Sequence, residues 1–372
     1  MRKTVLLLED SRKVGFGGGQ KGSLEVLTAL LPFFDVLVTD SIPNSLFARK
    51  AEAICGQPIT KLASFGSQGG GDKASFSIGI LELLLYPFLT ALNIFKLLRM
   101  CKKNEWNRSN AILYAPLKKT LVPAWILSLL CGIPFVYHAR NFDNRESIFF
   151  TPLHWLLRRA RYVLCVSKAV QANLALPQGI HLYNPILLQT QAQPRSIAGK
   201  PVITVAAFAS LFPWKGLDDL LQSVQHIQDP RRVRIRIYGK GPALAHLQTL
   251  VQWDSQILDF TNDVNQLMQN EIDIICMPSV APEAFGRVPM EGYSFGIPAI
   301  ATNIGAQAEI TLDGETGILV PPHSPRAIAD AIDQLLAQPD VYAHMSAQAL
   351  RHAETFDLKA FEVRVAQIFQ GI

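Results

Sequence analysis

Short apolar runs alternate with amphipathic stretches along the whole chain, a pattern typical of parallel sheets covered by helices on both faces. In the first half, the runs that predict strands are residues 5–8, 35–39, 111–115, 133–138 and 162–167. A predicted helix over residues 122–130, stopped by Gly132, joins two of these strands. The glycine-rich, polar segment from Gly66 to Lys73 predicts a surface loop.

The alternation starts again in the second half of the chain. The predicted strands there are residues 202–208, 233–238, 272–277 and 299–302, and the predicted helices are residues 216–228, 242–252, 287–295 and 325–337. Between the halves, residues 184–200 are rich in Gln and Pro and lack periodicity. We therefore expect a first domain over residues 1–188, a second over 189–352, and an amphipathic C-terminal helix within 353–372 that packs back across the first domain.

This α/β pattern predicts two doubly wound parallel-sheet domains that face each other across a cleft. In open α/β sheets, ligands bind beyond the carboxyl ends of the strands, so two such domains would share a ligand between their loop faces. The length of 372 residues fits two domains that each bury a core.

Only 17% of the residues are charged, which fits either large buried cores or a surface that contacts lipid. The net charge of +5 permits an anionic small molecule or an anionic membrane face as partner. Without an arginine-rich arm or a zinc-finger pattern, the sequence gives no reason to expect a nucleic-acid partner. For the apolar segment 78–100 two interpretations stay open: a core helix, which is favoured, or an interfacial helix on an anionic membrane.

The cysteines are odd in number, widely spaced and set in apolar runs, so they predict buried, reduced thiols. They are Cys55, Cys101, Cys131, Cys165 and Cys276. The N-terminal apolar run ends at Glu9 and Asp10, before a secretory segment forms. We expect a cytoplasmic protein, and the scattered histidines predict no metal site.

A loop and helix start in the second half carry the most informative chemistry. Glu283 lies on a loop after a predicted strand, and a helix opens near Arg287. The amides of Phe285, Gly286 and Arg287 would point outward at the helix start, which favours a phosphate. One turn into the helix, Glu291 would accept two hydroxyl hydrogen bonds of the kind that a ribose offers.

Three further features allow both a functional and an ordinary interpretation. Lys215 closes a strand-to-helix loop, where it would neutralise a diphosphate, or it is a solvated loop lysine. The glycine-rich run that contains Gly18 and Gly19 would bring amides to a phosphate or an acceptor, or it forms a flexible turn. His138, at the carboxyl end of a strand, is either a catalytic group or a satisfied strand-end histidine.

The order of these motifs resembles the C-terminal half of the retaining, two-domain GT-B glycosyltransferases, specifically glycosyltransferase family 4. The matching features, within residues 202–336, are Pro213-Trp214-Lys215-Gly216, Tyr238-Gly239-Lys240-Gly241, residues 273–279, the Glu-x7-Glu from Glu283 to Glu291, Gly296-Ile297-Pro298, and Gly317 to Pro321. The first half is similar more weakly, through Gly17-Gly18-Gly19, His138 and Val166-Ser167.

The resemblance implies GT-B architecture and transfer of a hexose, with retained configuration and usually without a metal, from a UDP- or GDP-sugar. The acceptor would be a glycan or a lipid-linked molecule in cell-surface polysaccharide or glycolipid synthesis, with peripheral contact to the inner face of the membrane. The catalytic residues would be Glu283, His138 and Lys215. The donor would be held by Gly18, Gly19, Lys215, Glu283, Phe285, Gly286, Arg287, Val288 and Glu291.

Two positions depart from the family pattern: Ser210, and Ala306 in Gly305-Ala306, where a Gly pair is more usual. Ser210 stands where the family usually has an Arg that pairs with the motif lysine on the diphosphate, and Arg287 or Lys240 would have to replace it. Two alternative functions therefore stay open. The first is a nucleotide-sugar epimerase or hydrolase of the same fold, and the second is a non-enzymatic nucleotide-sugar-binding subunit.

Overall fold

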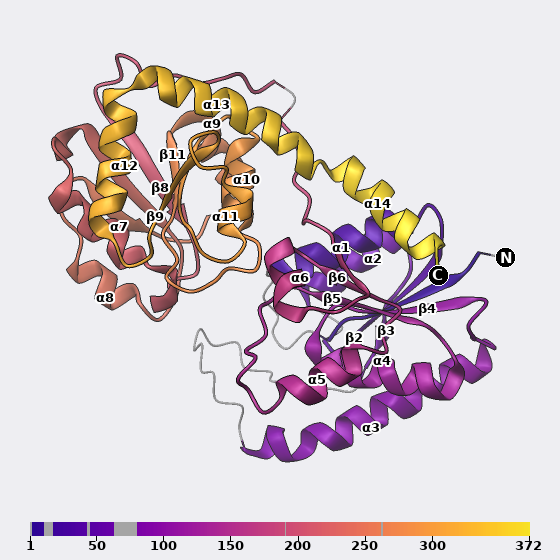
Figure 1. Ribbon diagram of the computed structural model, residues 1–372. Coiled ribbons are helices and arrows are strands. Elements are labelled where there is room, and N and C mark those ends of the chain that lie inside the picture. Colours follow the sequence, from indigo (N-terminus) through magenta and orange to yellow (C-terminus); the bar gives the residue numbers. More distant parts are fainter. Residues whose placement is uncertain (1, 11–17, 43–44, 63–79, 190, 262) are drawn as a thin grey trace. The chain divides into compact units, whose positions relative to one another are not determined.

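The computed structural model divides the chain into two compact α/β units, each with its own sheet (Figure 1). The first unit comprises Met1–Tyr183 and Lys359–Ile372, and the second comprises Asn184–Leu358. The structure describes residues 2–10, 18–42, 45–62, 80–189, 191–261 and 263–372. The predicted loop from Gly66 to Lys73 and the start of the glycine-rich run before Gly18 lie outside the described residues.

The first unit is built on a parallel sheet in the order β3-β2-β1-β4-β5-β6-β7. Its strands are β1 (Thr4–Leu8), β2 (Asp35–Asp40), β3 (Thr60–Lys61), β4 (Ala111–Ala115), β5 (Phe135–Ala139), β6 (Tyr162–Cys165) and β7 (Gly179–His181). Its helices are α1 (Gly18–Leu30), α2 (Leu46–Cys55), α3 (Ile80–Lys103), α4 (Lys118–Cys131), α5 (Phe150–Leu157), α6 (Lys168–Leu174) and α14 (Leu358–Gln370). The strand order runs outward in both directions from β1 and β4, which makes the sheet doubly wound.

Local sequence signals explain several of these elements. Every residue of β4 and β5 is buried, as expected for continuous apolar runs in a parallel sheet. Helix α2 begins at Ser45, whose side chain accepts a hydrogen bond from the Ala48 amide. Helix α4 ends at Gly132 in the left-handed conformation (φ +69°), which confirms the predicted stop.

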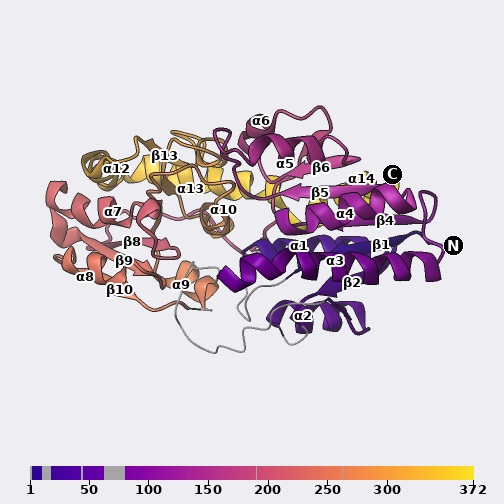
Figure 2. The ribbon, with the colours of Figure 1, turned by 90° about the horizontal axis from the view of Figure 1, so that it is seen from below.

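Helix α3 differs from the favoured prediction of a core helix. Phe88, Leu92 and Phe95 are exposed, whereas Leu97 and Cys101 are buried. One side of α3 packs toward α4 while another lies at the surface, because the helix lies on the outside of the sheet (Figures 1 and 2). Among the described residues, no helix is both long enough and apolar enough to cross a membrane.

The cysteine prediction holds in part. All five thiols are free, and Cys101, Cys165 and Cys276 are buried. Cys55 and Cys131 are only half-buried, because both lie in the last turn of a surface helix.

The second unit is built on a parallel sheet in the order β10-β9-β8-β11-β12-β13. Its strands are β8 (Ile203–Phe208), β9 (Val233–Tyr238), β10 (Ser255–Leu258), β11 (Ile274–Met277), β12 (Ala299–Thr302) and β13 (Gly317–Val320). Its helices are α7 (Leu217–Ser223), α8 (Leu244–Thr249), α9 (Val264–Asn270), α10 (Arg287–Tyr293), α11 (Gln307–Ile310), α12 (Pro325–Ala337) and α13 (Pro339–Ala353). A continuous apolar core joins β8, β9 and β11 to α7 and α12.

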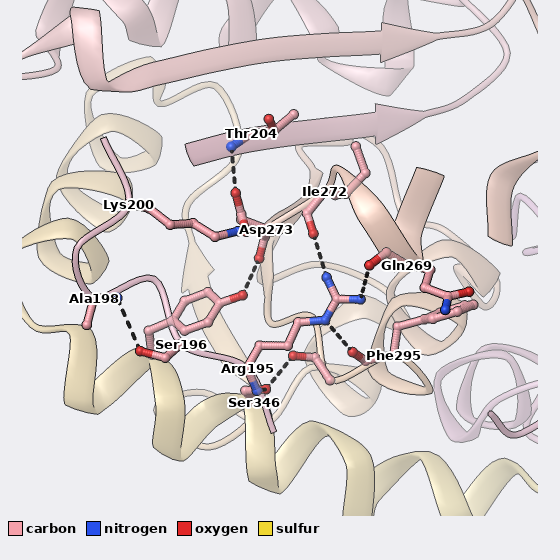
Figure 3. Close-up of polar contacts among 12 residues, drawn as sticks. Arg195, Ser196, Ala198, Lys200, Thr204, Gln269, Ile272, Asp273, Phe295 and Ser346 are labelled. Carbon is pink, nitrogen blue, oxygen red and sulfur yellow. Dashed lines mark hydrogen bonds and ion pairs between the residues drawn. The ribbon is translucent and has the colours of Figure 1, made fainter. Parts of the chain in front are cut away.

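The linker is tied to the amino edge of this second sheet by Arg195 (Figure 3). The Arg195 guanidinium donates hydrogen bonds to the carbonyls of Met268 (2.7 Å), Ile272 (2.9 Å) and Phe295 (2.7 Å). The Ser346 hydroxyl accepts a hydrogen bond from the Arg195 amide at 2.7 Å. One side chain therefore satisfies carbonyls from three segments, which fixes the linker to the unit.

Asp273 completes this cluster just before β11 begins. Its carboxylate accepts hydrogen bonds from Lys200 Nζ at 2.5 Å and from the Thr204 amide at 3.0 Å (Figure 3). The sequence resemblance includes Asp273 among its motifs, and the structure gives it a supporting position at the amino edge. The candidate site described next lies at the opposite, carboxyl edge.

Candidate functional site

Lys215 and Glu283 meet at the carboxyl edge of the second sheet. Lys215 ends a 3-10 turn after β8, and Glu283 lies on the loop after β11, a strand that pairs with β8. Lys215 Nζ lies 2.5 Å from Glu283 Oε1, and the two side chains are 16% and 11% exposed. The cation and the carboxylate that the sequence singles out separately therefore form one partly buried ion pair.

A buried network behind Glu283 was missed from the sequence. The Ser279 hydroxyl donates to the same Glu283 oxygen at 2.5 Å. Thr302 Oγ1 lies 2.7 Å from the Ser279 carbonyl and 2.5 Å from Gln307 Oε1, and Gln307 donates to the carbonyl of Met277. Its position is the sequence feature that could have indicated Ser279 as a site residue: it follows the end of β11 and precedes Glu283 by four residues.

Two glycines let the loops of the ion pair come together. Gly216 has φ +61°, and a Cβ there would lie 2.0 Å from the carbonyl oxygen of Pro278. Gly305 has φ +59°, and its Cβ would lie 2.8 Å from the backbone nitrogen and oxygen of Glu283. The Ala306 amide also donates to the Glu283 carbonyl at 2.9 Å. The backbone on both sides of the pair is thus held by close main-chain contacts.

Helix α10 opens beside the pair, close to the predicted start. Gly286 precedes the helix with φ +82°, and a Cβ there would lie 2.7 Å from Met277 Cε. Glu291 and Val288 are half-buried on the helix, and the Phe285 ring is buried.

Arg287 and Lys240, the two candidates to replace the family arginine, contact other groups. Arg287 Nη2 donates to the Pro185 carbonyl at 2.9 Å, and Lys240 pairs with Asp259 at 3.0 Å. Ser210 itself is exposed.

Trp214 borders Lys215 and does not belong to the core. Its ring is exposed, and the Lys215 ammonium lies 4.3 Å from the ring centroid. The tight turn that brings Lys215 toward Glu283 also places the indole against the ammonium, where a cation–π interaction forms.

His138 lies in a separate buried cluster within the first unit. Its Nδ1 is 2.7 Å from the Tyr114 hydroxyl and 3.3 Å from Arg140 Nη2, and Nε2 has no hydrogen-bond partner among the described residues. Burial, with a smaller contribution from Arg140, holds the pKa of His138 well below its usual value. The imidazole is therefore neutral at pH 7.

Arg140 joins His138 to the start of α1. It donates to the Gly19 carbonyl and to the Ser23 hydroxyl at 2.9 Å, and both Gly18 and Gly19 are exposed. Ser23 in turn donates to Glu9 at 2.8 Å. Burial raises the pKa of Glu9 to about 7, although Arg140 opposes the shift. Glu9 follows β1 directly and was not among the predicted site residues.

No group of three or more His, Cys, Asp or Glu side chains able to hold a metal ion occurs in the part of the chain that the structure describes. At the carboxyl ends of the strands, the described residues thus form two polar clusters, one in each unit. The first contains a neutral histidine and an arginine, and the second contains a lysine paired with a carboxylate.

Residues 190–352 match the family model described as Glycosyl transferases group 1. We call residues 190–352 the group 1 segment. The group 1 segment contains the Lys215–Glu283 pair, its supporting network and α10, whereas His138 lies outside it.

Curated relatives match about half of the chain. The chain is 32% identical over 206 residues to the D-inositol 3-phosphate glycosyltransferase of Corynebacterium glutamicum, which covers 51% of this chain and 49% of that protein. It is 29% identical over 214 residues to the enzyme of the same name from Corynebacterium diphtheriae, covering 53% of this chain and 50% of that protein. The chain thus spans about half the length of these relatives.

Solved structures match over the whole chain. HepE from Anabaena in complex with UDP has a TM-score of 0.80 at 21% identity, covering 99% of this chain and 100% of that chain. HepE in complex with UDP-glucose has a TM-score of 0.78 at 21% identity, covering 100% of both chains. The lipopolysaccharide outer core galactosyltransferase WaaB has a TM-score of 0.75 at 14% identity, covering 99% of this chain and 100% of that chain. These matches confirm the predicted class of fold, two parallel-sheet α/β domains of the GT-B type.

Proposed function

We propose that the protein is a retaining glycosyltransferase that moves a sugar from a nucleoside-diphosphate sugar to a glycan or lipid-linked acceptor. The observation that carries this proposal is the Lys215–Glu283 pair at the carboxyl edge of the second sheet, within the group 1 segment. The relatives named as glycosyltransferases, and the UDP and UDP-glucose held by HepE, support a UDP-sugar donor.

In this proposal the ion pair opens when the donor binds. The Lys215 ammonium passes to the diphosphate and stabilises the negative charge that grows on it as the sugar leaves. Glu283 then accepts hydrogen bonds from hydroxyls of the donor sugar, while Ser279 keeps its carboxylate oriented. The loops after two adjacent strands thereby supply an ammonium for the diphosphate and a carboxylate that accepts hydrogen bonds from the sugar.

The remaining donor contacts are assigned to α10 and the loop before it. The backbone from Phe285 through Gly286, Arg287 and Val288 supports the sugar and the phosphates, since Gly286 has no side chain to block a close approach. Glu291 accepts the ribose hydroxyls. We assign no donor contact to the Arg287 guanidinium, because it contacts the Pro185 carbonyl.

We propose a front-face reaction that needs no metal. The acceptor hydroxyl attacks the anomeric carbon from the side on which the diphosphate leaves, the bond to the phosphate oxygen breaks, and that oxygen takes the hydroxyl proton. His138 faces the reacting sugar as a neutral hydrogen-bonding group, and Gly18 and Gly19 contact the phosphate or the acceptor. We place the reaction in cell-surface polysaccharide or glycolipid synthesis, with peripheral contact to the inner membrane face.

The test is a transfer assay in which the protein is incubated with UDP- and GDP-sugars and a panel of glycan and lipid-linked acceptors. Released nucleoside diphosphate and glycosylated product should rise together. Lys215→Ala and Glu283→Ala should abolish both signals while the melting temperature shows a folded protein. Full activity in either variant would remove the role assigned to that residue.

Ser210, exposed where the family usually carries an arginine, favours one second candidate, a non-enzymatic nucleotide-sugar-binding subunit. This candidate predicts that UDP-sugar raises the melting temperature, since a ligand that binds only the folded state stabilises it, while no product forms with any acceptor. Donor consumption without an acceptor would instead indicate an epimerase or a hydrolase.

A further inference from the structure

The first unit carries an apolar surface over three neighbouring helices. Helices α3, α4 and α5 lie side by side on one face of the sheet, and Trp125 of α4 contacts Trp155 of α5 at 5.5 Å between ring centroids (Figure 2). The exposed large apolar side chains include Phe88, Phe95, Leu129, Leu130, Phe149 and Trp155. We call these six residues the α3–α5 surface.

The stripe on α3 has the spacing of one helix face. Phe88, Leu92, Phe95 and Arg99 are separated by four, three and four residues, so they follow one another along the helix. Phe88 and Phe95 are 61% and 60% exposed, although a buried position would remove their rings from water. Clustered exposed apolar side chains of this kind mark an interaction site.

The charge around this surface is mainly positive, with the exposed Glu105 and Glu146 next to its basic segments. Residues 87–104 and 147–161 contain seven Lys or Arg and no Asp or Glu. Two of the arginines lie against its aromatic rings: the Arg159 guanidinium is 3.6 Å from the Trp155 ring centroid, and that of Arg99 is 5.5 Å from Phe95. A surface that pairs aromatic rings with cations complements a layer that is apolar inside and anionic at its boundary.

We propose that the α3–α5 surface docks on an anionic lipid bilayer, with the aromatic and leucine side chains in the headgroup region and the basic side chains on lipid phosphates. The proposal extends the peripheral membrane contact suggested above by naming the surface that makes it, and it does not depend on the transfer reaction. A bilayer is favoured over an acidic protein because the exposed apolar side chains are spread over three helices, which a flat, deformable layer covers together.

The test is sedimentation of the full chain with vesicles of phosphatidylcholine and phosphatidylglycerol, and with vesicles of phosphatidylcholine alone. The wild-type protein should sediment with the anionic vesicles, and added salt should weaken this binding. A double variant, Phe88→Ser with Phe95→Ser, should lower the partition coefficient by at least about tenfold. Lys102→Gln and Lys103→Gln should each lower it by about fivefold.

A matched control comes from the opposite face of the same unit. Phe33 and Val363 are 47% and 57% exposed there, beside α1 and α14. Phe33→Ser with Val363→Ser removes similar apolar area and should leave vesicle binding within about twofold. Melting temperatures of both double variants show whether they fold.

Three outcomes would overturn the proposal. In the first, the wild-type protein stays in the supernatant with anionic vesicles at low salt. In the second, the control pair loses as much binding as the Phe88 and Phe95 pair. In the third, analytical ultracentrifugation without vesicles shows a dimer that only the Phe88 and Phe95 variant dissociates, which would assign the surface to a second copy of the chain. Vesicle binding that needs these two rings supports the bilayer.

Discussion

Lys215, which we propose binds the diphosphate, is paired with Glu283 in the free protein, and this pairing gives a prediction about nucleotide affinity. Lys215 Nζ and Glu283 Oε1 are 2.5 Å apart, and both side chains are largely shielded from water. A nucleoside diphosphate that takes the ammonium must displace this carboxylate or share the lysine with it. Glu283→Gln keeps the shape of the side chain and its hydrogen bond from Ser279 while it removes the competing charge.

The geometry sets the size of the effect. A charge-assisted hydrogen bond of this kind contributes about 1.5–3 kcal/mol, and about 1.4 kcal/mol corresponds to a factor of ten in Kd. Since this contact must break before the ammonium reaches the diphosphate, we expect Glu283→Gln to bind UDP at least about tenfold more tightly than the wild type. The affinity for UDP-glucose should rise less than the affinity for UDP, because Glu283→Gln removes the carboxylate that we propose accepts hydrogen bonds from the sugar hydroxyls.

Isothermal titration calorimetry with UDP, GDP and UDP-glucose measures these affinities at one ionic strength. Glu315→Gln is the matched control, because it removes an exposed carboxylate from the same unit, away from the ion pair. It should change the UDP affinity by less than about twofold. The reasoning is refuted if Glu283→Gln binds UDP no more tightly than this control, since the ion pair would then not oppose diphosphate binding.

Three further predictions test the supporting structure. Ser279→Ala should lower turnover by about ten- to a hundredfold while UDP affinity stays near that of the wild type, because Glu283 loses its orientation, as steady-state kinetics and calorimetry will show. Gly216→Ala should cost at least about 3 kcal/mol in denaturant unfolding, whereas Gly314→Ala, which has φ +74° but open space around it, should cost about 1 to 2 kcal/mol. Folded Glu9 keeps its proton up to about pH 7 and unfolded Glu9 only to about 4.5, so its contribution to stability falls as the pH rises through this window. Urea unfolding of Glu9→Gln should therefore show a gain over the wild type that grows by about 3 kcal/mol between about pH 4.5 and pH 8.

The strands of the sheet centres were predictable because strands buried on both faces are continuous apolar runs. Residues 111–115 and 299–302 match β4 and β12 at both ends. Residues 233–238 also match β9 at both ends, although Arg234 and Arg236 interrupt its apolar run. The edge strands β3, β7, β10 and β13 were missed, because all four are short and the first three carry polar residues that resemble loops.

Helix α3 shows why burial could not be predicted from apolar content alone. Its apolar positions suit a core as well as a surface, and the number of faces that a helix buries depends on its neighbours. The neighbours of α3 leave Phe88 and Phe95 outside.

The same limit separates the predictable part of the candidate site from the rest. Lys215 and Glu283 each follow a predicted strand, so the rule that ligands bind at carboxyl ends selects both. Their direct contact spans 68 residues of sequence and exists because β8 pairs with β11, an order that the alternation of strands and helices does not determine. The contact between Ser279 and Glu283 could not be predicted either. The Ser279 hydroxyl reaches the carboxylate only because the loop brings Glu283 back toward the end of β11. A carboxylate held at once by a buried serine and a lysine is placed before any ligand arrives. In the proposed reaction, donor binding therefore releases the lysine without moving the serine.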